Sequence, residues 1–202
     1  ASLTAGIDVN STDFTLEDCE FYESATTGLV WVDINGGAAN ACDRAKIIGN
    51  RFYCATAGNW DRAIELGEVA DGVEIVGNVI IGDFDDAAIH NITGKVLTNL
   101  LIANNYVRNN QAGQHAIELV SACTGAAFDN RLVTNALATS FDAGALSCMG
   151  NLWQITTGGD VEGGPPNPAS DEATSFVGAD NADNAVATTN VVANKDGSVL
   201  ER

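Results

Sequence analysis

The sequence has little positive charge, few aromatic side chains and no long apolar run. Its 9 Lys and Arg residues stand against 27 Asp and Glu, so the 202-residue chain carries a formal net charge of −18. A field of that sign repels phosphate backbones and anionic bilayers, and we therefore expect neither a nucleic acid nor a membrane as partner. No apolar run approaches the ~18 residues that span a bilayer. Ala1 begins no basic-then-apolar signal segment, and we interpret it as a processed or trimmed start.

Known signatures of catalysis and metal binding are also missing. The five cysteines include no Cys-x-x-Cys pair, and neither His90 nor His115 stands at zinc-ligand spacing from one of them. Free, mostly buried thiols in a protein made in a reducing cytoplasm account for this pattern. There is no Gly-x-Ser-x-Gly, His-Glu-x-x-His, phosphate-binding-loop or dinucleotide-binding motif. No reaction can therefore be assigned from a known motif.

Glycine and asparagine, by contrast, are abundant. The 21 Gly and 20 Asn make up a fifth of the chain, and both favour turns and left-handed backbone while disfavouring helix interiors. Apolar residues still reach 46% and charged residues only 18%, which argues against a wholly disordered chain. The composition indicates a folded, turn-rich protein with little helix.

Six short segments repeat along the chain with a marker residue at the same place in each. An apolar or small residue stands three positions before the marker, and an apolar residue stands two positions after it. The markers are separated by 31, 28, 27, 25 and 21 residues and are Cys19, Asn50, Asn78, Asn105, Asn130 and Asn151.

The parity of these positions predicts two short strands joined by a sharp corner. Positions −5 and −3 share one strand face, as do 0 and +2, but the alternation slips between −3 and 0. We expect the asparagine to occupy the corner, because it tolerates left-handed backbone better than other non-glycine residues. A third apolar segment follows each corner, as at residues 30–32, 64–66 and 117–119.

Three short strands per turn of the chain describe a parallel β-solenoid, in which successive coils stack at ~4.8 Å. A leucine-rich repeat would need a denser leucine pattern, and a propeller blade would need ~40 residues per repeat. The Ile-x-Gly-Asn-x-Phe/Ile signature with turns of variable length resembles the right-handed parallel β-helix superfamily typified by pectate lyases and phage tailspikes. The resemblance covers residues 7–153.

This resemblance implies an all-β, right-handed parallel β-helix of about five to six coils, which we assign to residues 1–157. It also implies an inward ladder of stacked carboxamides. Amides in such a column donate to and accept from one another, so that buried polar groups are satisfied. Cys19 departs from the pattern at the first rung, as expected of a terminal coil. The ladder residues are Asn50, Asn78, Asn105, Asn130 and Asn151.

Residues 158–202 form a second region of different composition. Residues 158–168 contain all three prolines and are predicted to be an extended linker. Ser198 as N-cap and Glu201 at the capping-box position predict the start of a helix. Residues 190–202 resemble a segment common in structural proteins of tailed bacteriophages, where it leads into a coiled-coil or assembly region. The resemblance implies an assembly tail.

Candidate catalytic residues lie where an outer column of the solenoid is expected. If the isoleucines before them point inward, Glu65, His90 and Glu118 share one outer face with Trp31 and Asp142. Glu65 and Glu118 would then lie ~9–10 Å apart between Cα atoms, near the ~6.5–9.5 Å between the carboxyl groups of an inverting glycosidase. His90 would shift the pKa of either carboxylate, and Trp31 would stack on a sugar ring. The alternative, which we favour, is a solvated charged face without a catalytic role.

A candidate metal site is the acidic turn that contains Asp83, Asp85 and Asp86. Clustered carboxylates can hold Ca²⁺ through hard oxygen ligands, although no EF-hand spacing is present. We favour the alternative of a solubilising loop without a bound cofactor. A lyase of this superfamily would also need a basic residue, and Arg108 and Arg131 near the middle coils adjoin corners, where surface pairing is expected.

These observations favour a non-enzymatic virion protein of a phage, such as a capsid decoration, head-fibre or tail-fibre module for particle assembly or host attachment. We expect it to act in the virion after synthesis in the bacterial cytoplasm. Its expected partners are copies of itself, as a homotrimer, other virion proteins and a host-surface glycan. The alternatives are a polysaccharide-degrading lyase or glycosidase domain of the tailspike type, and a secreted adhesin.

Overall fold

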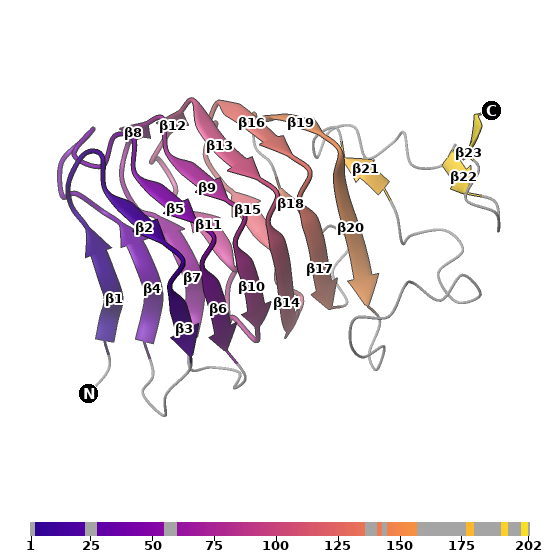
Figure 1. Ribbon diagram of the computed structural model, residues 1–202, viewed down its shortest axis with the longest axis horizontal. Coiled ribbons are helices and arrows are strands. Elements are labelled where there is room, and N and C mark those ends of the chain that lie inside the picture. The colour runs from indigo at the N-terminus through magenta and orange to yellow at the C-terminus, as the bar shows by residue number, and fades with distance from the viewer. Residues whose placement is uncertain are drawn as a thin grey trace.

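The computed structural model describes residues 3–22, 28–54, 60–135, 141–142, 145–156, 177–179, 191–193 and 199–201. Every regular element in these residues is a β-strand, and the strands stack into a right-handed parallel β-solenoid (Figure 1). The all-β class and the solenoid expected from the repeat are confirmed. None of the described segments is a helix long and apolar enough to cross a membrane.

Successive turns of the chain deliver one strand to each of three parallel sheets, and each sheet contains six of these strands. Sheet 1 consists of β1 (Leu3–Val9), β4 (Gly28–Ile34), β7 (Trp60–Leu66), β11 (Ile89–Asn91), β15 (Ile117–Leu119) and β18 (Phe141–Asp142). Sheet 2 consists of β2 (Thr15–Glu17), β5 (Lys46–Ile48), β9 (Glu74–Val76), β13 (Leu100–Ala103), β16 (Gly125–Phe128) and β19 (Ser147–Met149). Sheet 3 consists of β3 (Glu20–Tyr22), β6 (Arg51–Cys54), β10 (Val79–Gly82), β14 (Tyr106–Ala112), β17 (Arg131–Asn135) and β20 (Asn151–Thr156).

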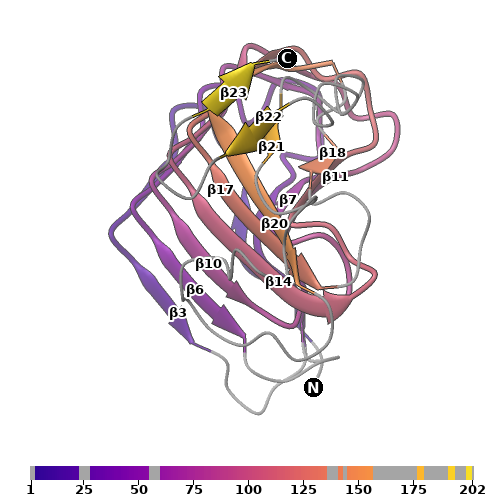
Figure 2. The same cartoon turned by 90° about the vertical axis from the view of Figure 1, so that its right-hand side faces the viewer.

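The remaining strands are short and lie outside this pattern. β8 (Ala70–Asp71) pairs in parallel with β12 (Leu97–Thr98), and β21 (Val177–Ala179) joins β20 antiparallel. β22 (Val191–Ala193) pairs antiparallel with β23 (Val199–Glu201), so the last strand occupies the place where the sequence predicted a helix start. Ser198 and the proline-rich linker lie outside the described residues. In the end view of Figure 2, sheet 3 is on one side of the coil, and β7, β11 and β18 of sheet 1 are on the other.

The interior is filled by apolar side chains stacked in the columns that the repeat predicted. The position three before each marker forms one such column in sheet 2: Leu16, Ile47, Ile75, Ile102, Ala127 and Cys148. The position two after each marker forms another in sheet 3: Phe21, Phe52, Ile80, Val107 and Leu132. The backbone of Trp153 continues this register. A third column in sheet 1 contains Val32, Ile64, Ile89, Ile117 and Phe141, all buried. Each column removes apolar surface from water at every coil.

The corner between sheets 2 and 3 is turned by the residue before each marker. That residue has a positive φ in every coil, at Asp18, Gly49, Gly77, Asn104, Asp129 and Gly150. The marker asparagines do not, so the prediction that they occupy the left-handed corner is wrong by one residue. The preceding residue faces outward and takes the left-handed conformation, which Gly, Asn and Asp tolerate best, while the asparagine points its amide into the stack.

The asparagine ladder expected inside the coil is present, and its five residues are at most 2% exposed. In the first four of them, Nδ2 donates to the Oδ1 of the next rung at 2.7–3.1 Å, and the backbone N–H of the same residue donates to that Oδ1 as well. The second Nδ2 proton goes to a backbone carbonyl, such as Ile75 O for Asn105. Cys19, at the first rung, donates its backbone N–H to Asn50 Oδ1, while its thiol donates to Glu17 O. Every inner rung is therefore fully hydrogen-bonded.

The five cysteines are free, as expected from their number and spacing. Cys42, Cys54, Cys123 and Cys148 are buried, and Cys19 is half-buried. They act as small apolar side chains in the core or packed against it.

Candidate functional site

The predicted outer column of sheet 1 is confirmed for its ionisable residues. Asp33 of β4 is in register with Glu65 of β7, Glu65 with His90 of β11, and His90 with Glu118 of β15. Asp142 of β18 continues the register. We call the side chains of Asp33, Glu65, His90 and Glu118 the sheet-1 outer column. Although it faces away from the core, Glu65 is only 7% exposed.

A local irregularity in β7 adds an arginine to this face. Ala63 and Ile64 are both buried, and both of their N–H groups donate to Ala88 O. This two-against-one pairing is a β-bulge. Because of it, successive outward-facing side chains of β7 are three residues apart at this point instead of two. Arg62 therefore faces outward together with Glu65.

Arg62 holds two carboxylates of neighbouring coils. Its Nη1 pairs with Glu65 Oε2 and its Nη2 with Asp86 Oδ2, while Asp86 Oδ1 accepts the Ala87 N–H at 2.8 Å. Sequence reasoning missed Arg62, because strand alternation places residues 62 and 65 on opposite faces. The bulge that overturns the alternation has no glycine or proline to reveal it in the sequence.

Burial and these contacts set the protonation of the cluster. Burial raises the pKa of Glu65, and the Arg62 charge opposes this without cancelling it. Burial also acts to raise the pKa of Asp86, but the Ala87 N–H and Arg62 outweigh it, so this pKa is lowered. The pKa of His90 is lowered, chiefly because burial disfavours the imidazolium. At neutral pH His90 is therefore neutral and Asp86 ionised.

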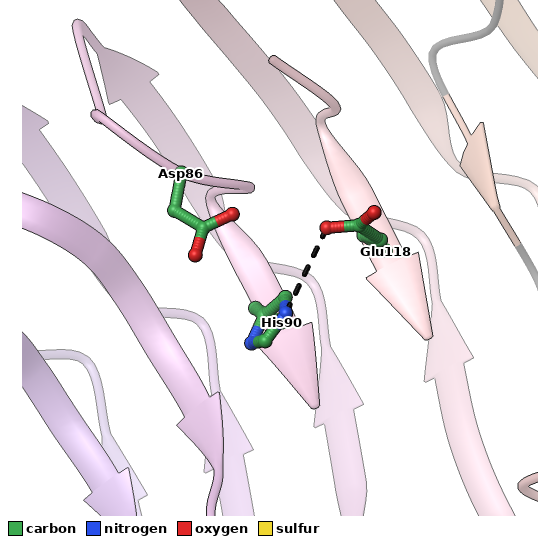
Figure 3. A group of neighbouring side chains, drawn as sticks. All are labelled: Asp86, His90 and Glu118. Atoms are coloured by element: carbon green, nitrogen blue, oxygen red, sulfur yellow. Dashed lines mark ion pairs between the residues drawn. The ribbon is translucent and has the colours of Figure 1, made fainter. Parts of the chain in front are cut away.

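Two histidines flank the Glu118 carboxylate. His90 Nε2 lies 3.7 Å from Glu118 Oε2, and His115 Nδ1 lies 3.6 Å from Glu118 Oε1. Figure 3 shows how Asp86, on the segment before β11, joins His90 and Glu118 from two neighbouring strands. One ligand atom from each of these three residues lies within 4.8 Å of the other two. This mixed nitrogen and oxygen set is the part of the described chain that could hold a metal ion.

Three buried polar atoms on this face have no hydrogen-bond partner among the described residues. They are Asp33 Oδ1, Arg62 Nε and His90 Nδ1. Buried polar atoms are rarely left unpaired in folded proteins, and those that are call for an explanation.

Trp31 does not belong to this face, and the prediction that it could stack on a sugar is wrong. Its side chain is 4% exposed, and its ring lies 5.0 Å from that of Trp60 and 6.0 Å from that of Phe52 between centroids. Large aromatic rings gain more from packing with one another inside the coil than from facing water. Trp31 is therefore a core residue.

Only one of the three aspartates of the acidic turn lies in a group that could hold a metal ion. Asp86 joins His90 and Glu118, whereas Asp83 is half-buried and Asp85 exposed, and the three-residue donor group includes neither. Arg108 was expected to pair on the surface near a corner, and its Nε donates to Asn110 Oδ1.

The chain was compared with models of known protein families, with curated proteins and with solved structures, and nothing in any of the three matched it.

Proposed function

We propose that the chain is a non-enzymatic structural module of a phage particle that assembles with copies of itself, as a homotrimer, and with other virion proteins. It belongs, in this proposal, to the pectate-lyase-like β-helix superfamily. The observation that carries the assembly part is a patch of exposed apolar side chains on the outer face of sheet 3. We call it the sheet-3 patch, and it consists of Tyr22, Tyr53 and Val79 on the adjacent strands β3, β6 and β10, which are 36–64% exposed.

The sheet-3 patch has the features of a contact surface. Tyr22 and Tyr53 are in register on adjacent strands, with ring centroids 6.4 Å apart. Their rings are apolar and rigid, which suits them to interfaces, and clustered exposed apolar side chains mark interaction sites on soluble proteins. The phage-like segment at residues 190–202 supports the choice of a virion as the assembly.

The oligomeric state tests this proposal directly. Light scattering after size exclusion, or native mass spectrometry, is expected to give three times the 20.9 kDa chain mass. Replacing both Tyr22 and Tyr53 with Ser should release monomers with unchanged strand content by circular dichroism. Met149→Ser is the control, because Met149 is 71% exposed in sheet 2 and lies outside the patch. A wild-type chain that stays monomeric at high concentration would exclude the proposal.

The virion location has its own test. An antibody raised against the purified chain should label phage particles in electron micrographs of lysates from the source of this sequence. Labelling of cell envelopes instead of particles would point to an adhesin.

A second candidate function is cleavage of a host-surface polysaccharide. The observation that favours it is the raised pKa of Glu65, which is what a general acid needs, in a column with His90 and Glu118. Purified protein should then release reducing ends or unsaturated uronate from polysaccharide, and Glu65→Gln or Glu118→Gln should abolish the release. No cleavage at high protein concentration would remove this candidate.

A further inference from the structure

We propose that Asp86, His90 and Glu118 bind a divalent transition-metal ion, with Zn²⁺ as the favoured occupant, and that the ion links two successive coils of the solenoid. His90 belongs to β11 and Glu118 to β15, which are neighbours in sheet 1, and Asp86 lies on the segment that leads into β11. The site is independent of the assembly proposed above, and it shares His90 and Glu118 with the cleavage candidate.

The geometry is close to that of an occupied site. The three donor atoms lie within 4.8 Å of one another, whereas ligands at the usual ~2.0–2.2 Å from Zn²⁺ are ~3.3 Å apart in a tetrahedron. Binding would therefore require the side chains of His90 and Glu118 to rotate towards Asp86, and His90 Nε2 is already 3.7 Å from Glu118 Oε2. Three protein ligands leave the fourth position of the ion to water or to His115, whose Nδ1 already faces Glu118.

The imidazole of His90 presents a nitrogen to the other donors. Its Nε2 lies 3.7 Å from Glu118 Oε2, while Nδ1, on the other side of the ring, has no hydrogen-bond partner among the described residues. Neutral imidazole is the commonest nitrogen ligand of metals. The nitrogen donor also favours a first-row transition metal over Ca²⁺, which takes oxygen ligands.

The charges around the three donors favour a cation. Asp33, Glu65, Asp86 and Glu118 bring four carboxylates to the face, and Arg62 is the one guanidinium paired with them in the described chain. Arg62 and the Ala87 N–H hold the Asp86 carboxylate in place. Hydrogen bonds of this kind orient metal-binding carboxylates and are a regular part of metal sites.

Titration calorimetry with ZnCl₂ on metal-stripped full-length protein tests the site. We expect one Zn²⁺ per chain for the wild type and at least ~10-fold weaker binding for His90→Gln, since even outer-shell changes cost that much. Glu118→Gln should lose affinity to a similar degree and replaces His90→Gln if that variant fails to fold. Asp85→Asn is the matched control, because it removes one charge from the same turn at an exposed position outside the donor group. Equal affinity in wild type and in either ligand variant, or no Zn²⁺ binding by the wild type, would overturn the proposal.

Co²⁺ distinguishes this site from the cysteines. Bound at Asp86, His90 and Glu118, Co²⁺ should give visible d–d bands without a thiolate charge-transfer band, and His90→Gln should remove the d–d bands. A thiolate band in the wild type would assign the metal to a cysteine and overturn the proposal.

Discussion

Two polar columns run along this solenoid, and they solve the same stacking problem differently. The ladder from Asn50 to Asn151 lies inside the coil and repeats one side chain, whereas the sheet-1 outer column sets unlike side chains in register. In the ladder, hydrogen bonds join each amide to its neighbours from Asn50 to Asn151. In the outer column and the arginine beside it, buried atoms such as His90 Nδ1 and Arg62 Nε have no hydrogen-bond partner within the described part of the chain.

The difference follows from what each side chain can offer. A carboxamide has donors at one end and an acceptor at the other, so identical rungs satisfy one another in a column of any length. A carboxylate only accepts hydrogen bonds, and a neutral imidazole has one donor and one acceptor. A column of these groups therefore lacks donors, and its carboxylates need an additional partner such as Arg62 or a metal ion. A self-sufficient column suits a core, and a column that needs partners suits a binding face.

The largest effect is expected from breaking the ladder at its centre. Asn105→Ala leaves the backbone N–H and one Nδ2 proton of Asn78 without their acceptor, and it removes the donor to Ile75 O. We expect a loss of about 3 kcal/mol in the free energy of unfolding, measured by urea denaturation. Asn104→Gly is the control, because the neighbouring Asn104 is exposed and left-handed, with φ 55°, and glycine should change stability by less than about 0.5 kcal/mol. Equal losses in the two variants would show that the amide stack contributes little.

Removing the arginine from the outer face should have the next largest effect. Arg62→Leu leaves Glu65 buried without its partner, and breaking such pairs costs several kcal/mol when both groups are fully buried. Because the Arg62 side chain is 21% exposed, we expect about 2 kcal/mol at pH 7. Arg51→Leu should cost less than about 0.5 kcal/mol, since Arg51 and Glu20 are exposed and 4.0 Å apart. A loss for Arg62→Leu no larger than this would mean that the outer column does not depend on its guanidinium.

The sequence predicted the ladder far better than the outer face, for a physical reason. Every rung repeats the same pair of requirements, an inward amide and a tolerant residue before it, so Asn50 through Asn151 leave a periodic signal. The outer face repeats nothing. Trp31 was expected there because it alternates with the apolar residues Val30 and Val32. Its position in the core depends instead on contacts with Phe52 and Trp60 from other coils.

The same limit applies to the site itself. The register of Glu65, His90 and Glu118 followed from the buried isoleucines before them and was predicted correctly. The position of Arg62 on this face depends on a bulge, and the position of Asp86 depends on the path of a turn. No residue type in the sequence indicates either feature.

Acidification should weaken the fold through His90. In the folded state the pKa of His90 lies below the ordinary value of 6.5. The contribution of neutral His90 to the free energy of unfolding is therefore fully present above pH 6.5, and it is lost as the pH falls from 6.5 towards the folded-state pKa. Arg62 and His115 act to lower this pKa, while Asp86 and Glu118 act to raise it. Melting temperatures from pH 8 to 5.5, with chelator present, should fall more for the wild type than for His90→Gln.

Comparison with the variant isolates His90 from Glu65. The raised pKa of Glu65 acts in the opposite direction, since its contribution is present at low pH and is lost as the pH rises from 4.5 through the folded-state value. Both proteins contain Glu65, so the difference between their pH profiles belongs to the histidine. Parallel profiles would show that His90 does not titrate in a buried setting.

The smallest effect is expected on the outer face of sheet 2, where charges also stack in register. Lys46 Nζ lies 2.8 Å from Glu74 Oε1 across adjacent strands, but these side chains are 39% and 32% exposed. Water and salt screen such a pair, so Glu74→Gln should cost less than about 0.5 kcal/mol, and the cost should vanish in high salt. A cost above about 1 kcal/mol that persists in salt would mean that exposed charges in register stabilise the coil as strongly as buried ones. Burial would then not explain the difference between the outer faces of sheets 1 and 2, which would have to come from their residue types.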